Sequence, residues 1–143
     1  MRAALAAVSV SVMAVGAVSG MGVAWAQPPV PSAGELTGEL QQVLNTGAPA
    51  GDRAAKLEGG DAALPTADNI ANRLNAYGGL LNWQVQNPAL NGDRLDAQLA
   101  VTIPIWGTKT HDIYWVDQGG TWKLSNASAC VIATDAAGVA CTV

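Results

Sequence analysis

The sequence predicts an α+β domain in which two to three N-terminal helices pack on a curved antiparallel sheet of about four strands. Two observations lead to this class. Apolar residues recur at helical spacing in two segments between residues 32 and 77, whereas apolar and polar residues alternate with a period of two from residue 80 to residue 127. Helices that precede a series of strands joined by short turns are typical of α+β domains, whose helices cover one face of the sheet.

The first helix is predicted to begin after Ser32. Ser32 and Glu35 form the S-x-x-E pattern of a capping box, in which each side chain satisfies a backbone N–H at the start of the helix. An apolar stripe then starts at Leu36 and recurs four, seven and eight residues later. The segment Asn45-Thr46-Gly47 is expected to end this helix.

Two further helices are expected before the sheet. Residues 53–58 are compatible with a short helix that ends at Gly59-Gly60. A longer helix is predicted after Pro65, because Ile70 and the apolar residues one, four and seven positions later share one face. Gly78-Gly79 is expected to end it.

The strands are predicted from alternation and from turn residues. Residues 87–93 contain Pro88 and an Asn-Gly pair and are expected to form a turn. Pro104 indicates a strand edge or a bend, and Gln118-Gly119-Gly120 indicates a hairpin loop. The predicted strands are residues 80–86, 95–103, 109–117 and 121–127. The predicted core is Leu36, Leu40, Leu44, Ile70, Leu74, Trp83, Leu99, Val101 and Trp115.

Residues 1–26 are predicted to be a secretory signal. Arg2 supplies a positive start, an uncharged stretch rich in Ala, Val, Gly and Ser follows, and Ala24-Trp25-Ala26 is a small-x-small cleavage site. An uncleaved anchor helix is the alternative, but Ala and Gly gain little on transfer into lipid and no basic residue follows the stretch. We therefore expect a protein that is secreted, extracellular or in the cell envelope, with a Pro-rich lead (27–31) before a single domain of residues 32–143.

The tail contains the two cysteines of the chain, Cys130 and Cys141. Outside the cytoplasm such a pair usually forms a disulfide. A metal-binding or redox-active pair is the competing interpretation, but the spacing is not C-x-x-C and no third cysteine is present. We expect a structural disulfide that closes the C-terminal tail, whose secondary structure after Ala129 the sequence leaves ambiguous.

The charge excludes some partners. After residue 26 the chain carries six basic and eleven acidic residues, a net charge of −5. A nucleic-acid binder needs a basic face to neutralise phosphates, so no nucleic-acid partner is expected. The same charge argues against electrostatic docking on anionic lipid, so no membrane association is expected after signal cleavage.

The residues capable of catalysis form no recognisable set. His111 and Asp112 are neighbours on a predicted strand, so their side chains point to opposite faces. A lyase or isomerase with a cone-like fold would need His111, Asp96, Asp112, Tyr77 or Tyr114 inside a cavity, with a carboxyl of raised pKa. We expect no enzyme, no cofactor and no metal site, and keep that enzyme as the alternative.

Aromatic side chains are the candidate contacts for a ligand or partner. Most tryptophans on alternating strands are expected in the core, but Trp83 is also placed to line a cavity. Trp106 is the exception, because it lies between Pro104 and Gly107 at a strand end, where an exposed indole can bind a partner. Tyr114 is the third candidate contact.

Three segments resemble a known family. They are P-S-A-G-E-L-T at 31–37, K-L-E-G-G at 56–60, and V-D-Q-G-G-T-W-K-L-S-N-A-S-A at 116–129. In the same order, they resemble the C-terminal domain of the mycobacterial low-molecular-weight secreted antigen family. The resemblance implies an exported actinobacterial protein with a curled sheet wrapped by helices, similar to the cystatin-like cone shared with nuclear transport factor two. It implies no catalytic residue, and it does not lead us to expect Cys130 and Cys141.

These observations favour an exported, non-enzymatic binding or interaction domain. Its partner is expected to be a small apolar ligand, a cell-envelope component or another protein, because a curved sheet covered by helices can leave a cavity between its layers. The alternative is a cone-fold lyase or isomerase acting on a small apolar substrate. A surface or matrix protein without a specific ligand is a third possibility.

Overall fold

The structure is a computed structural model that describes residues 27–143, and the predicted secretory signal of residues 1–26 lies outside the described residues. Within the described part, no helix has the length and apolar character needed to cross a membrane. The elements in chain order are α1 (Ala33–Val43), α2 (Ala50–Ala54), the 3-10 helix η1 (Gly60–Ala63), α3 (Leu64–Ala76), β1 (Asn82–Asn91), β2 (Arg94–Ile103), β3 (Gly107–Gln118), β4 (Thr121–Leu124), α4 (Asn126–Val131) and its π-helical continuation η2 (Ile132–Ala137).

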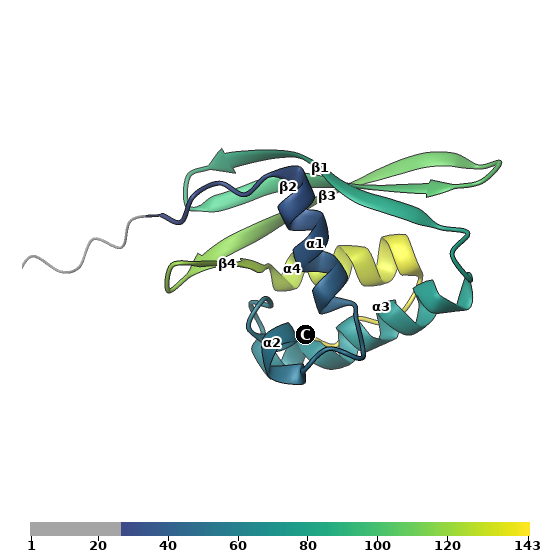
Figure 1. The fold of residues 1–143 in the computed structure, drawn as a ribbon, viewed down its shortest axis with the longest axis horizontal. Helices are drawn as coiled ribbons and strands as arrows, with labels where there is room; N and C mark the ends of the chain where they lie inside the picture. The colour runs from purple at the N-terminus through teal and green to yellow at the C-terminus, as the bar shows by residue number, and fades with distance from the viewer. Residues whose placement is uncertain (1–26) are drawn as a thin grey trace, which may run out of the picture.

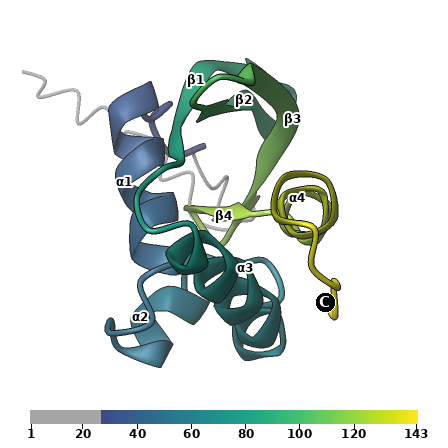
Figure 2. The ribbon, with the colours of Figure 1, turned by 90° about the vertical axis from the view of Figure 1, so that its right-hand side faces the viewer.

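The four strands form one antiparallel sheet in the order β1-β2-β3-β4, so each strand pairs with its neighbour in sequence. The sheet curls into an arch, and the helices lie on its concave side (Figure 1 and Figure 2). The predicted α+β class is confirmed, and the curl is consistent with a cone-like arrangement. One helix that was not predicted, α4, follows the sheet instead of preceding it.

The core fills the space between the arch and the helices. Along β2, Leu95, Ala97 and Leu99 are buried against the helices, while the residues between them face outward. Six of the nine predicted core residues are buried, and the other three, Leu44, Leu74 and Trp83, are half-buried and pack against them.

The start of α1 confirms the capping box. The backbone N–H of Glu35 donates to Ser32 Oγ at 3.2 Å, and the N–H of Ser32 donates to the Glu35 carboxylate at 2.7 Å. The hydrogen bond from the Ser32 backbone N–H, and after it the Ser32 side chain, stabilises the charged carboxylate and lowers the pKa of Glu35 below its ordinary value of 4.5. One turn later, Thr37 Oγ1 accepts from the N–H of Val85 at 2.9 Å, which places α1 along the free edge of β1.

The short helix predicted over residues 53–58 is wrong in its position. The helix α2 ends at Ala54, and Leu57 instead forms a parallel bridge with Leu124 of β4. The N–H of Glu58 donates to the carbonyl of Leu124, and the N–H of Leu124 donates to the carbonyl of Lys56, both at 2.9 Å. Because Leu57 is almost fully buried, packing overrides the helical pattern of this segment.

The turn predicted over residues 87–93 is also wrong in its extent. The strand β1 continues to Asn91 through a bulge, in which Asn87 and Pro88 together lie opposite Ala97. Asn87 has a φ of +55°, which Asn tolerates better than most residues. A bulge leaves residues outside the ladder, so it accommodates a proline that has no N–H to donate.

The fourth strand ends at Leu124, three residues before the predicted end, because Ser125 caps α4. Ser125 Oγ accepts from the N–H of Ser128 at 3.0 Å and donates to Ser128 Oγ at 2.8 Å. Ser128 Oγ also accepts from the N–H of Tyr114 at 2.7 Å, which ties α4 to the edge of β3. Both serines are buried, so this network satisfies backbone groups that water cannot reach.

The tail is closed by the predicted disulfide between Cys130 and Cys141, whose Cα atoms are 5.2 Å apart. Thr66 of α3 adds a second attachment, because its buried Oγ1 accepts from the N–H of Thr142 at 2.9 Å. The Pro-rich lead is also attached, since the indole Nε1 of Trp122 donates to the carbonyl of Pro29 at 3.1 Å. Both ends of the described chain therefore lie on the domain.

Candidate functional site

The β2–β3 hairpin and the end of α3 together form one end of the molecule (Figure 1). Ile103 and Gly107 make the last pair of the hairpin, and the N–H of Trp106 donates to the carbonyl of Ile103 at 3.1 Å. Between them, Ile105 has a φ of +75°. A β-branched residue rarely adopts this left-handed conformation, which costs about 1–2 kcal/mol.

An apolar groove of about 370 Å³ lies beside this loop, and we name it the hairpin-end groove. Four of the side chains that line it are large, apolar and exposed: Ile105 (103%), Trp106 (81%), Leu80 (64%) and Tyr77 (43%). Most other large apolar side chains of the described chain are packed in the core. The complete lining is Tyr77, Leu80, Leu81, Val101, Ile103, Pro104, Ile105, Trp106 and Ala136.

Basic groups border the hairpin-end groove. Lys109 pairs with Val101 across β2 and β3, so both side chains lie on the same face of the sheet. Arg73 lies beside Tyr77, with its guanidinium carbon 6.0 Å from the centroid of the ring. Each cation therefore neighbours a lining residue.

Carboxylates are absent from the segments that build the groove. No Asp or Glu occurs in residues 69–92 or 97–111, which supply every lining residue except Ala136. Asp135 precedes Ala136 in sequence, and its carboxylate accepts a hydrogen bond from the hydroxyl of Thr134 at 3.0 Å. Although the chain as a whole is acidic, this end is locally basic.

The second aromatic candidate, Trp83, lies between the sheet and the helices. It is half-buried and lines a cavity of only about 20 Å³, together with Leu99 and Ile132. A cavity of this size has room for about one water molecule. In the described chain the space around Trp83 is therefore packed core with no room for an organic ligand.

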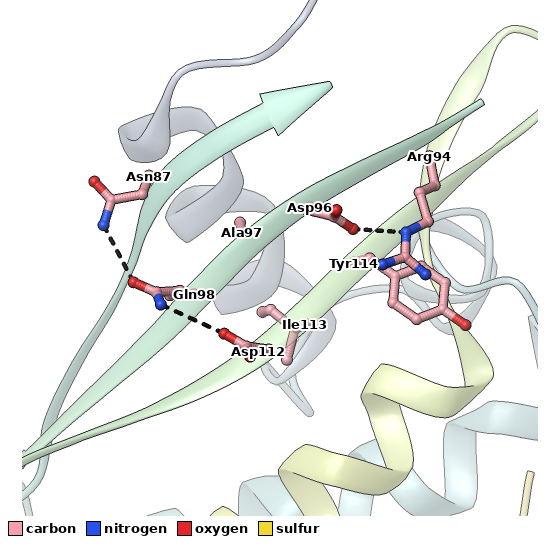
Figure 3. A pocket seen from close by; sticks show the side chains of 8 residues that line it. All are labelled: Asn87, Arg94, Asp96, Ala97, Gln98, Asp112, Ile113 and Tyr114. Atoms are coloured by element: carbon pink, nitrogen blue, oxygen red, sulfur yellow. Dashed lines mark hydrogen bonds and ion pairs between the residues drawn. The ribbon is translucent and has the colours of Figure 1, made fainter. Parts of the chain in front are cut away.

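The third candidate, Tyr114, lies on the outer face of the sheet in an open polar hollow of about 670 Å³ (Figure 3). The guanidinium carbon of Arg94 lies 4.5 Å from the centroid of its ring, and Arg94 Nε is 2.7 Å from a carboxylate oxygen of Asp96. In the same hollow, Gln98 donates to Asp112 Oδ1 at 3.4 Å. The polar groups of the hollow are thus paired largely with one another.

Residues 29–141 match the sequence model of a family described as low molecular weight antigen MTB12, C-terminal domain. The chain belongs to this family. No curated protein matches it, and no solved structure does either. The family resemblance is therefore confirmed, whereas the cystatin-like assignment stays a prediction.

Two of the segments that carry the family resemblance meet in space. Glu58 and Gly59, from the segment 56–60, pack against Asn126, from the segment 116–129: a Glu58 carboxylate oxygen accepts from the N–H of Asn126 at 2.6 Å. A Cβ atom on Gly59 would lie 2.7 Å from Asn126 Oδ1, which explains the glycine there. These family segments hold α4 and the loop after α2 together, and they lie outside the lining of the hairpin-end groove.

The residues considered for catalysis are divided between surfaces. Asp96, Asp112 and Tyr114 share the outer hollow, whereas His111 pairs with the inward-facing Leu99 on the other face of the sheet. Tyr77 lies in the hairpin-end groove. Among residues 27–143, no three side chains of the kinds that bind metals gather at one place. The groups available for acid–base chemistry are therefore not assembled in one closed site.

Trp106 was predicted from the sequence as a candidate contact, whereas Ile105 and Leu80 were not predicted as parts of the same surface. A signal was present, because Ile103-Pro104-Ile105-Trp106 is a run of apolar residues at a predicted turn. Such runs in exposed turns occur where function requires them. The contribution of the end of α3 to this surface could not be predicted from the sequence, because it depends on how α3 packs against the sheet.

Proposed function

We propose that the protein is an exported, non-enzymatic binding domain whose hairpin-end groove holds the acyl chain of an amphiphile with an anionic head group. The observation that carries this proposal is the gathering of exposed apolar side chains around one groove, with Ile105 in a left-handed conformation at its rim. Strain of this kind persists in proteins mainly where function uses it. Export is supported by the pattern of residues 1–26 and by membership of an antigen family.

The chemistry of the ligand follows from the lining and the border. A groove of about 370 Å³ falls within the usual range for small-molecule sites, and its apolar lining suits a hydrocarbon chain. Lys109 and Arg73 beside the lining suit a carboxylate or phosphate at the end of that chain. The carboxylate-free segments around the groove avoid repelling such a head group.

The pairing and the open location of the carboxylates favour a binding role over catalysis. Asp96 is paired with Arg94, and Asp112 accepts from Gln98, both on an open face of the sheet. General acid catalysis by a carboxyl favours a closed, apolar setting that raises its pKa. A groove without any carboxylate in its lining suits retention of a ligand better than its conversion.

The test is calorimetric titration of residues 27–143 with palmitate, the sodium salt of a long-chain fatty acid. Trp106→Ala is expected to weaken binding about tenfold, which corresponds to about 1.4 kcal/mol of lost contact. The matched control is Leu90→Ala, because Leu90 is also exposed (46%) but lies at the β1–β2 turn, away from the groove lining. That control is expected to bind palmitate as the unmodified protein does.

The head group is tested separately with Lys109→Gln. This variant is expected to bind palmitate more weakly while its affinity for the uncharged monoacylglycerol with the same chain stays unchanged. Equal palmitate affinity in the unmodified protein and in the Trp106 variant would refute the proposed site. Palmitate binding that the Lys109 variant leaves intact would refute the anionic head group.

A further inference from the structure

We infer that the apex of the β2–β3 hairpin, Ile105 and Trp106, docks the protein on a lipid surface that carries anionic head groups. The inference rests on the proposed function in one respect: the lipid surface would be the source of the acyl chain that the groove takes up. It goes beyond that function because it assigns a second partner, the lipid surface, to the exposed parts of two side chains that also line the groove.

The position of the two apex side chains supports docking. Ile105 is fully exposed and Trp106 nearly so, and they are consecutive at the apex of a hairpin at one end of the molecule (Figure 1). Tryptophan is enriched where membranes meet water, because its ring is apolar and its N–H is polar. Leu80 and Tyr77 are exposed beside the same groove, so the apolar surface continues from the apex to the end of α3.

The backbone conformation of Ile105 also supports docking. A left-handed φ of +75° is suited to Gly or Asn, and the side chain of Ile105 contributes nothing to the core because it is fully exposed. The chain thus bears a conformational cost to present a large apolar group to its surroundings. An apolar phase outside the protein gives that side chain a favourable environment.

The local charge around the groove favours a surface with anionic head groups. The net charge of −5 after residue 26 led us to expect no association with anionic lipid, but a net charge is an average over the whole surface. Lys109 and Arg73 lie beside lining residues, and the segments 69–92 and 97–111 carry no carboxylate. His111, two residues after Lys109, adds no negative charge, and Asp135 is the acidic residue nearest in sequence to the lining. Attraction to anionic head groups decays within about 10 Å at ordinary salt. The local charge of this end, and not the net charge of the chain, therefore decides whether it is attracted to an anionic lipid surface.

Docking through two apolar side chains and two cations is expected to be weak and reversible. Stable membrane attachment needs a larger inserted area or a second anchor, and the described chain offers no helix that spans a bilayer. The protein would therefore visit the lipid surface and leave it again, which suits a carrier more than a permanent membrane component.

The experiment is flotation of residues 27–143, which contain the whole core, with vesicles of phosphatidylcholine alone or mixed with phosphatidylglycerol. The bound fraction is expected to be several-fold higher on the mixed vesicles and to fall at high salt. Ile105→Asn and Trp106→Ala are each expected to reduce it several-fold, while Leu90→Asn, an equal change at an exposed leucine elsewhere, leaves it unchanged. Denaturation curves of the variants confirm that each is folded.

The outcomes separate this inference from the proposed function. Vesicle binding by a protein that does not bind palmitate in solution supports docking and refutes the groove as an acyl-chain site. Palmitate binding without vesicle binding overturns docking and leaves the proposed function standing. Equal binding to both kinds of vesicle, or flotation that Ile105→Asn and Leu90→Asn reduce alike, also overturns the inference.

Discussion

Replacing Ile105 with asparagine is expected to stabilise the protein while it removes binding. Ile105 has a φ of +75° and a fully exposed side chain, so the substitution relieves the backbone and sacrifices no buried area. The left-handed conformation costs an ordinary L-residue about 1–2 kcal/mol, and asparagine tolerates it much better. Among residues 27–143, the other left-handed non-glycine position is already an asparagine, Asn87.

We therefore expect Ile105→Asn to raise the free energy of unfolding by about 1 kcal/mol, which is about 4 °C in Tm for a domain of this size. Ile105→Gly relieves the same strain but loses about 0.5–1 kcal/mol of that gain, because glycine makes the unfolded chain more flexible. Ile105→Val keeps the β-branch and is expected to match the unmodified protein. Urea denaturation followed by tryptophan fluorescence measures all three.

The ranking of the variants carries the test. If Ile105→Asn is no more stable than Ile105→Val, the left-handed conformation stores no strain, and the argument from strain to function fails with it. If Ile105→Asn and Ile105→Val raise the free energy of unfolding equally, the gain comes from a change in the unfolded chain and not from relief of backbone strain. A gain that is largest for asparagine, smaller for glycine and absent for valine, together with lost palmitate binding, would show that stability is given up at the apex for function.

Three further predictions concern the framework. Ser128→Ala leaves the N–H of Tyr114 without its hydrogen-bond partner next to the buried Ser128 site. Urea denaturation is expected to show that the free energy of unfolding falls by about 2 kcal/mol. A fall below about 0.5 kcal/mol would contradict the role of this network. Reduction of the Cys130–Cys141 disulfide is expected to cost about 3 kcal/mol, and a double serine variant that still responds to reductant would disprove that origin. Since the pKa of Glu35 is lowered in the folded state, its stabilising effect is complete above pH 4.5 and is lost as the pH falls through the lower folded value. Glu35→Gln is expected to remove this part of the acid sensitivity, and a carboxyl NMR titration of Glu35 that gives an ordinary pKa would count against it.

The parts of the fold that local signals specify were predictable from sequence. The start of α1 depends on Ser32 and Glu35, which lie three residues apart and need no other part of the chain. The long alternation of apolar and polar residues over 95–103 predicted the strand β2, because the apolar face of such a strand has to be buried. The disulfide was also predictable, because the two cysteines follow a predicted export signal and such pairs usually form a disulfide outside the cytoplasm.

The parts that depend on tertiary contacts were not predictable. Leu57 has a helical neighbourhood in sequence, but its bridge to Leu124 depends on a strand 67 residues later. The helix α4 has six residues, and the serine that caps it lacks the Glu or Gln of a capping box. At the candidate site, the turn residues around Trp106 indicated its exposure, whereas Leu80 joins the groove only because α3 packs where it does.

The short length of β4 leaves a different surface along β3. Only residues 115–118 of β3 pair with β4, and Ser128 of α4 binds the N–H of Tyr114, so in the described chain residues 107–112 of β3 have no strand partner on the side away from β2. Such an edge is a template for another extended chain, and lysine on an edge is a common protection against self-association. The charge of Lys109 therefore also contributes to colloidal stability, and Lys109→Gln material is expected to need a check for oligomers before its affinities are compared.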